Sequence, residues 1–277
     1  MRFLICGLGS IGRRHVQNLL HLGQNDLILY RTHKGLMPDE EFNMFKVETE
    51  LEKALDHKPD AAIISNPTAL HLNVAIPAVK NGCHVLIEKP ISHSMQRIKD
   101  LVEVVEKTSR KVLVGFQFRF HPSLKYIKKV IEDDVIGKPL YAHAHWGEYL
   151  PVWHPWEDYR RGYSARNDLG GGVVLTLCHP IDYLVWLLGD VLSVQANVGK
   201  SSNLEIEVED HAEAILHFDN GVVGSLHINY FQQPKQQILK IIGTKGTIDW
   251  DNEDGTVRVI HSGESDSMVF EPDSTFE

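Results

Sequence analysis

The chain has 277 residues, enough for one large domain or two ordinary ones, and its 43% hydrophobic and 23% charged residues are typical of a soluble globular protein. A formal net charge of −9 argues against nucleic acid as a partner. No apolar run approaches the roughly 18 residues of a membrane-spanning helix, and no signal-like segment precedes the first apolar stretch. We therefore expect a cytoplasmic protein that does not bind membranes.

The sequence opens with a glycine-rich motif that directly follows a short apolar run at 3–6. Gly7, Gly9 and Gly12 have the spacing G-x-G-x-x-G, and an apolar stripe predicts a helix over 11–22. In this order of strand, turn and helix, a glycine has no side chain to keep the backbone away from a pyrophosphate. The N-terminus of the helix then faces the phosphates. A glycine-rich turn without a ligand is the alternative. We predict that a dinucleotide binds at Gly7, Gly9, Ser10, Ile11 and Gly12.

The end of the second predicted strand, 27–30, bears on which nicotinamide dinucleotide binds. NAD-binding domains usually place Asp or Glu there to hold the ribose 2′-hydroxyl. This chain continues with Arg31, Thr32, His33 and Lys34 instead. A carboxylate repels a 2′-phosphate, whereas Arg31 attracts it. We therefore predict NADP in preference to NAD, with a solvated basic turn as the alternative explanation.

Short apolar runs alternate with helical patterns through the first 119 residues. Further strands are predicted at 61–65, 84–87 and 112–114, and helices around 70–78 and over 94–108. Pro77 stands inside the first of these helices, where it removes a hydrogen bond. This alternation predicts a parallel, doubly wound sheet. The strand at 84–87 brings Glu88, Lys89 and Pro90 to the sheet edge where ligands bind in such folds.

After Arg119 the pattern changes to long alternating strands. One helix is predicted over 121–130, and strands over 141–149, 191–198, 208–218, 222–230 and 238–242. Asp219-Asn220-Gly221 is typical of a hairpin turn. These patterns predict a large, mostly antiparallel sheet with one face on helices and the other available for self-association. The expected fold is thus α/β, with a Rossmann domain at 1–119 and an α/β sheet domain at 120–277.

The sequence predicts no metal site. The three cysteines, Cys6, Cys83 and Cys178, lie in apolar contexts without a C-x-x-C motif, which is typical of buried free thiols in a reducing compartment. His143 and His145 alternate along one predicted strand. No carboxylate or cysteine stands beside them at metal-ligand spacing, and we interpret them as residues of the sheet face.

The segment 151–166 is too aromatic for a solvated linker and too polar for a core. Flat aromatic rings can stack on a sugar ring, and arginines can bind a carboxylate or phosphate. A loop packed by its own aromatic side chains is the alternative, and the sequence leaves both open. The residues concerned are Trp153, Trp156, Tyr159, Arg160, Arg161, Tyr163 and Arg166.

A helix is predicted over 170–188, opened by three consecutive glycines. Thr176, His179 and Asp182 follow at i, i+3 and i+6, and Tyr183 lies one turn after His179. These positions share one face of a continuous helix. His179 is a structural histidine in one interpretation and a catalytic histidine in the other.

Seven segments together resemble the glucose–fructose oxidoreductase/inositol dehydrogenase (Gfo/Idh/MocA) family. They are GLGSIG, NPTALH, EKP, GFQFRFHP, DLGGG, CHPIDYLVWLLG and GTKGTIDWD, and they span nearly the whole chain. The resemblance implies a Rossmann domain followed by an α/β domain with a large, mostly antiparallel sheet. It implies NAD(P)-linked oxidation or reduction of sugars, cyclitols or their nucleotide-linked forms. It also suggests a homodimer or homotetramer assembled through the sheet.

The resemblance carries specific residues with it. By position, Lys89 matches the family's active-site lysine and His179 its active-site histidine. Many members carry an Asp one turn before that histidine, where this chain has Leu175 and Thr176, so the usual carboxylate is missing. The implied cofactor-binding set is Gly7, Gly9, Ser10, Ile11, Gly12, Arg31, Thr32, Asn66, Pro67, His71, Glu88, Lys89 and Gln117. The implied substrate-binding set is Lys89, Arg119, Trp153, Tyr159, Tyr163, Arg166, Thr176, His179 and Asp182.

Two functions from different classes follow. The first is a dehydrogenase or reductase of a sugar-like alcohol, in which the His179 imidazole exchanges the hydroxyl proton and Lys89 polarises the oxygen, or the reverse. Asp182 is expected to orient His179 or to bind a substrate hydroxyl. The second is a nucleotide-sensing protein without turnover. This alternative remains because the usual family Asp is missing. The presence of both Lys89 and His179 favours the enzyme, and the resemblance suggests biosynthesis of a cell-surface sugar.

Overall fold

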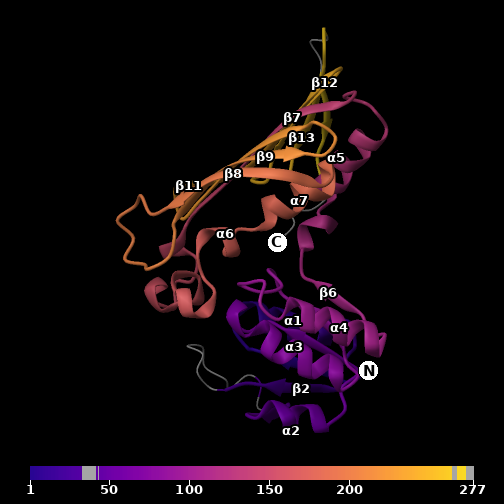
Figure 1. Ribbon diagram of the computed structural model, residues 1–277, viewed down its shortest axis with the longest axis vertical. Coiled ribbons are helices and arrows are strands. Elements are labelled where there is room, and N and C mark those ends of the chain that lie inside the picture. Colours follow the sequence, from indigo (N-terminus) through magenta and orange to yellow (C-terminus); the bar gives the residue numbers. More distant parts are fainter. Residues whose placement is uncertain (33–41, 43, 264–266, 273–277) are drawn as a thin grey trace. The chain divides into compact units, whose positions relative to one another are not determined.

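The computed structural model describes residues 1–32, 42, 44–263 and 267–272 (Figure 1). It divides into two compact units, one of Met1–Gly115 with Arg166–Gly171 and one of Phe116–Ala165 with Gly172–Glu277. The boundary predicted at residue 119 thus lies within the second unit, and a short segment predicted for the second domain belongs to the first unit.

The first unit contains a six-stranded sheet in the order β3-β2-β1-β4-β5-β6. All of its strand pairs are parallel. The strand order reverses between β1 and β4, which is the switch point where ligands bind in open α/β sheets. The predicted doubly wound sheet is confirmed. Its strands are β1 (Phe3–Cys6), β2 (Leu27–Tyr30), β3 (Lys46–Glu48), β4 (Ala61–Ile64), β5 (His84–Ile87) and β6 (Val112–Val114).

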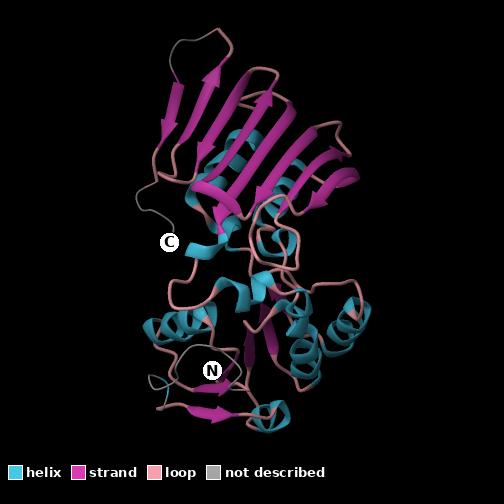
Figure 2. Cartoon of the chain, turned by 90° about the vertical axis from the view of Figure 1, so that its left-hand side faces the viewer, coloured by secondary structure: helices cyan, strands magenta, loops and turns pink. Residues whose placement is uncertain are grey.

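Helices cover both faces of this sheet (Figure 2). Alternate side chains of β1 divide between the faces, so that Leu4 packs with α2–α4 and Ile5 packs with α1. The helix predicted to start at 94 begins at Ile98, because Arg97 before it has a left-handed φ of 62°. The helices are α1 (Ser10–His21), α2 (Leu51–Asp56), α3 (His71–Lys80) and α4 (Ile98–Thr108).

The second unit is built on an eight-stranded sheet in the order β14-β13-β12-β11-β7-β10-β9-β8 (Figure 2). Only the pair β7–β10 is parallel, and the other pairs are antiparallel, so the predicted mostly antiparallel sheet is confirmed. The strand predicted at 238–242 is longer, because Phe231 already pairs with Tyr149. The strands are β7 (Pro139–Tyr149), β8 (Val191–Gly199), β9 (His211–Phe218), β10 (Val223–Asn229), β11 (Phe231–Gly243), β12 (Gly246–Asp251), β13 (Val257–His261) and β14 (Ser267–Phe270).

Period-two alternation divides the second sheet into a covered and an open face. On β7, Ala142, Ala144 and Trp146 are buried in the core. That core includes side chains of α5 (Pro122–Glu132) and α7 (His179–Leu188). His143 and His145 point to the opposite face by the same alternation. In the part of the chain that the structure describes, no helix lies on that face (Figure 1).

The helix predicted over 170–188 is wrong as a single element, because it breaks into α6 (Val173–Thr176) and α7 (His179–Leu188). Pro180 has no N–H to donate to the carbonyl of Thr176, and its ring clashes with that carbonyl in a continuous helix. The same proline is well suited to the first turn of a new helix. The break places Thr176 on a different helix from His179 and Asp182, so these side chains do not share one helical face.

The helices of the described residues differ in length and in apolar character. No single helix there is long and apolar enough to cross a bilayer. The segments Asn167–Thr176 and His179–Leu188 reach the required length and composition only when taken together, with a bend between them. Leu184, Leu187 and Leu188 of the latter segment are buried in the core of the second unit.

Candidate active site

The three glycines of the turn between β1 and α1 have different surroundings. Gly7 has a φ of 97°, and a Cβ built on it lies 2.7 Å from the backbone nitrogen of Asn66. A Cβ on Gly12 lies 2.0 Å from the carbonyl oxygen of Gly7, so both positions admit only glycine. A Cβ on Gly9 meets nothing within 4 Å. Open space at Gly9, next to the N-terminal N–H groups of α1 at Ser10 and Ile11, fits a pyrophosphate.

Two arginines lie near the end of β2. The backbone N–H of Arg31 donates to the carbonyl of Glu48 at 3.0 Å, which continues the sheet by one residue. Burial, and then the nearby charge of Arg13, lower the pKa of Arg31. The Arg13 guanidinium packs over the Phe42 ring at 4.9 Å and donates to the carbonyl of Leu8. The exposed Thr32 follows, whereas His33 and Lys34 lie outside the described residues.

His71 connects the loops that follow β4 and β5. Its ring is 1% exposed. Nδ1 lies 2.9 Å from the carbonyl oxygen of Pro90, and Nε2 lies 2.9 Å from that of Asn66. Burial lowers the pKa of His71, although both hydrogen bonds oppose the shift. Its structural task is therefore to hold the loop of Asn66 and Pro67 against the loop of Lys89.

The loop after β5 contains Glu88 and Lys89. One Glu88 oxygen lies 2.7 Å from Nε2 of His15, on the helix that follows the glycine turn. A Cβ on Gly115 comes within 3.2 Å of the same carboxylate, so the glycine makes room for it. Lys89 is half-buried at the carboxyl end of β5. This is the edge of a parallel sheet at which ligands bind.

In the second unit, His179 is enclosed by aromatic side chains. It is the first residue of α7 and is 5% exposed. Its ring centroid lies 4.8 Å from that of Phe118, 5.6 Å from that of Trp146 and 6.2 Å from that of Phe116. The Gln117 amide nitrogen lies 3.5 Å from His179 Nε2. The sequence analysis missed this enclosure, although the alternation along β7 already places Trp146 on the helix-covered face.

Asp182, one turn after His179, binds Arg119. Nε and Nη2 of Arg119 donate to the two carboxylate oxygens at 2.9 and 2.7 Å. The Asp182 side chain is 8% exposed, and the Arg119 side chain is 44% exposed. The hydrogen bond from Arg119 to this carboxylate raises the pKa of Arg119. Asp182 was expected to orient His179 or bind a substrate hydroxyl, and the structure shows it holding the arginine.

Thr176 and Tyr230 form a separate buried contact. Burial raises the pKa of Tyr230 well above its ordinary value, although a hydrogen bond with Thr176 opposes the shift. The Tyr230 hydroxyl also donates to the carbonyl of Ser164 at 3.3 Å. Tyr230 therefore links α6, through Thr176, with the loop that contains Ser164.

Most side chains of the aromatic loop at 151–166 that were candidates for a sugar site contact other residues of the chain. Trp153 makes an edge contact with Tyr230, and the Tyr159 hydroxyl accepts from the backbone N–H of Glu205. The remaining cavity beside these residues and Tyr163 measures about 20 Å³, close to the volume of one water. Arg160 binds Asp158 and Glu205, and Arg166 binds Asp168. These contacts favour the packed-loop interpretation over a ready sugar platform.

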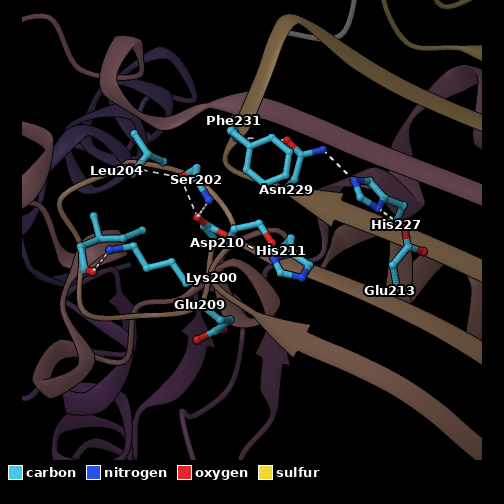
Figure 3. A network of polar contacts seen from close by, with 12 residues as sticks. Lys200, Ser202, Leu204, Glu209, Asp210, His211, Glu213, His227, Asn229 and Phe231 are labelled. Carbon is cyan, nitrogen blue, oxygen red and sulfur yellow. Dashed lines mark hydrogen bonds and ion pairs between the residues drawn. The ribbon is translucent and has the colours of Figure 1, made fainter.

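A buried carboxylate organises the loop before β9 (Figure 3). The Asp210 side chain is fully buried and accepts from the Ser201 and Ser202 amides, the Ser202 hydroxyl and Nδ1 of His211. Burial by itself raises the pKa of Asp210, and these hydrogen bonds outweigh it, so that the pKa lies below its usual range. The strand predicted from 208 begins only at His211 because these bonds hold 201–210 as a loop.

The described residues contain no group of three or more His, Cys, Asp or Glu side chains arranged to hold a metal ion. Cys6, Cys83 and Cys178 are free and buried. Burial raises the pKa of Cys83 to about 11, so this thiol is unreactive at neutral pH.

Comparison with known proteins identifies both units. Residues 1–116 match the model "Oxidoreductase family, NAD-binding Rossmann fold", and residues 124–249 match the GFO/IDH/MocA C-terminal domain. Myo-inositol 2-dehydrogenase of Thermotoga maritima is 26% identical over 96% of this chain and 80% of the relative. Scyllo-inositol 2-dehydrogenase (NAD(+)) of Bacillus subtilis is 27% identical over 90% of this chain and 73% of the relative.

Solved structures give the same result for the fold. A levoglucosan dehydrogenase in complex with NADH and levoglucosan has a TM-score of 0.86 at 19% identity and covers 98% of this chain and 80% of its own. The WlbA dehydrogenase of Bordetella pertussis, in complex with NADH and UDP-GlcNAcA, has a TM-score of 0.79 at 25% identity over 90% of this chain and 77% of its own. With both units matched, the chain belongs to the Gfo/Idh/MocA family of oxidoreductases with an NAD-binding Rossmann domain.

Proposed function

We propose that the protein transfers a hydride between a nicotinamide dinucleotide and a sugar-like alcohol or carbonyl, such as a sugar, a cyclitol or a nucleotide sugar. The aromatic enclosure of His179 carries the proposal, because it holds a proton-transfer group in a water-poor setting within a member of an oxidoreductase family. The names of the relatives, which refer to inositols and levoglucosan, support this substrate class.

The chemistry requires two groups at the reacting oxygen. The dinucleotide supplies the hydride acceptor or donor. Oxidation of an alcohol also removes the hydroxyl proton, so one side chain takes the proton and another steadies the developing charge. We assign His179 to the proton and Lys89 to the charge, with the exchanged roles as the alternative. Arg119 is a further candidate for binding a substrate hydroxyl, because its two hydrogen bonds to Asp182 use two of the five N–H donors of the guanidinium.

For the cofactor, we propose a preference for NADP. The support is the proximity of Arg13 and Arg31 at the end of β2, where a 2′-phosphate would be placed. Against this preference stand the relatives and solved structures named for NAD(+) or NADH.

For the assembly, we propose a cytoplasmic homodimer or homotetramer formed through the open face of the second sheet. This face carries polar side chains such as His143 and Ser225, which hydrogen-bond each other. Exposed Ile215, Ile242 and Ile260 stand among them, at 43%, 37% and 39% exposure. The exposed apolar side chains and the lack of a covering helix in the described part of the chain support assembly through this face.

A substrate screen tests the proposed function. Purified protein is incubated with NADP or NAD and with sugars, cyclitols, sugar acids and nucleotide sugars, and reduced nicotinamide is followed by absorbance. We expect turnover with at least one member of the panel. Tight binding of dinucleotide without turnover on any of them, in either direction, would favour the nucleotide-sensing alternative.

A further inference from the structure

Trp146 forms one wall of the His179 enclosure and is itself held by a carboxylate. The indole is 4% exposed, and its ring centroid lies 5.6 Å from that of His179 with 31° between the planes. An imidazolium within about 6 Å of an indole centroid is attracted by the negative charge of the ring face. Phe118 supplies a second ring at 4.8 Å. The enclosure is therefore suited to a protonated histidine as well as a neutral one.

Glu148 lies two residues along β7 from Trp146 and accepts its indole N–H. The distance from Trp146 Nε1 to Glu148 Oε1 is 2.7 Å. A carboxylate that accepts the N–H draws positive charge to that edge of the indole and leaves the ring face more negative. Both donors to Glu148 Oε1, the Trp146 indole and the Gln237 amide, are neutral. The negative charge of Glu148 is thus not cancelled by these two contacts.

Further hydrogen bonds fix Glu148 in position. The Gln237 amide donates to Glu148 Oε1 at 2.5 Å, and the Asn252 amide donates to Gln237 Oε1 at 2.5 Å. Asn252 also makes a side-chain hydrogen bond with His121, whose ring stacks on Phe118 at 5.6 Å. Two of the aromatic walls of His179, Trp146 and Phe118, therefore belong to one connected polar and aromatic network, which links β7, β11 and the β12–β13 turn.

Among the described residues of the second unit, three other titratable groups near His179 are paired or neutral. Arg119 and Asp182 form a bidentate pair of opposite charges. Burial lowers the pKa of His121 to about 4, so that His121 is neutral at physiological pH. Burial raises the pKa of Tyr183, which keeps its hydroxyl neutral. Glu148 is thus a carboxylate bound to an aromatic ring that lies beside His179.

We propose that Glu148 is a positioning residue that acts through Trp146 to favour the protonated form of His179. The inference rests on the proposed role of His179 in proton transfer. In the direction of alcohol oxidation, His179 receives the hydroxyl proton, and the charge on Glu148 stabilises the imidazolium that results. In the direction of carbonyl reduction, the same charge keeps the proton on His179 until the oxygen takes it.

The test is a proton-NMR titration of the His179 imidazole in the protein without substrate, its signal assigned by its loss in His179→Ala. Glu148→Gln keeps an oxygen acceptor for the indole and removes the charge. We expect the titration midpoint of His179 to move to lower pH by roughly half a unit. Trp146→Phe keeps a ring but loses the N–H contact with Glu148, and we expect a shift in the same direction.

Glu213→Gln is the matched control, because Glu213 also binds a histidine, His227, but on the open sheet face. It should leave the His179 midpoint unchanged. Once a substrate is known, the acidic limb of the kcat/KM profile should move with the midpoint in Glu148→Gln. An unchanged His179 midpoint in a folded Glu148→Gln protein contradicts the inference. The proposed function fails separately, if His179→Ala keeps its turnover.

Discussion

At the scale of single residues, the turn between β1 and α1 depends on local backbone geometry, whereas the contacts of the polar side chains depend on residues far apart in the chain. The spacing of Gly7, Gly9 and Gly12 alone indicated their different tasks, since backbone geometry depends on local sequence. The binding of Asp182 to Arg119 joins residues 63 positions apart, and no local pattern reveals such a pair. The enclosure of His179 by Trp146 has the same non-local origin.

Gly9 and Gly12 give a contrast that tests the cofactor site. A Cβ on Gly12 collides with the carbonyl of Gly7, whereas a Cβ on Gly9 meets nothing in the protein. We expect Gly12→Ala to lower the melting temperature and to weaken binding of dinucleotide. Gly9→Ala should leave the melting temperature unchanged and still weaken binding by about tenfold or more, because the methyl group occupies space left for the pyrophosphate. Calorimetry and fluorescence titration measure the two effects, and unchanged affinity in Gly9→Ala would place the pyrophosphate elsewhere.

Arg31→Asp tests the proposed preference for NADP. The substitution replaces a cation by a carboxylate that repels a 2′-phosphate and accepts a 2′-hydroxyl. We expect affinity for NADP to fall by about tenfold or more and affinity for NAD to hold or rise. Arg2→Asp, on the same unit and bound to Asp26, controls for the change in net charge. Equal affinities for the two dinucleotides in the wild type, unaffected by Arg31→Asp, would remove the preference.

At the scale of elements, the sequence predicted most strands and helices of the sheets but not their interruptions. Apolar periodicity continues through Leu177 and Cys178, so 170–188 has the pattern of one helix, and only Pro180 signals the break. The short strand β3 and helix α2 went unpredicted, because three and six residues are too few to show a period. The alternation of apolar and polar residues that predicts a strand begins at 208, but residues 208–210 belong to a loop that Asp210 holds through hydrogen bonds.

Asp210→Asn tests the element that begins β9. The pKa of the folded-state carboxyl lies below its ordinary value, so the stability it contributes is fully present above about pH 4 and is lost as the pH falls through the folded value. We expect the variant to lose about 1–3 kcal/mol of unfolding free energy at pH 7. The difference from wild type should shrink below pH 4. Urea unfolding at pH 7 and pH 3 measures both, and a difference independent of pH would assign the effect to packing.

At the scale of the whole molecule, the fold class and both family domains followed from the sequence, since the change from strand–helix alternation to long alternating strands is a global pattern. The exact boundaries between the two units were harder to predict from the sequence. Residues 166–171 belong to the first unit although, in the sequence, they lie between parts of the second unit. The order of the predicted elements does not show that the chain comes back to the first unit. The proposed assembly likewise involves a surface that the sequence marks only as an uncovered sheet face.

Ile215→Asp tests the proposed assembly. A carboxylate at this exposed position on the open sheet face should weaken an interface formed there and lower the mass measured by light scattering. Leu113→Asp is the control, because Leu113 is an exposed apolar residue of β6 in the first unit, at 64% exposure. A monomeric wild-type protein, or an unchanged oligomer in Ile215→Asp, would contradict assembly through this face.

The central claim is that Lys89 and His179 perform chemistry on a substrate beside a dinucleotide whose phosphates they do not hold. Measuring turnover and cofactor affinity together tests it most directly. In Lys89→Met and His179→Ala we predict turnover lower by roughly 10²–10⁴-fold, with the dissociation constant of the dinucleotide nearly unchanged. His143→Ala, on the open sheet face, should keep wild-type turnover. Near-wild-type turnover in either of the first two variants would contradict the account.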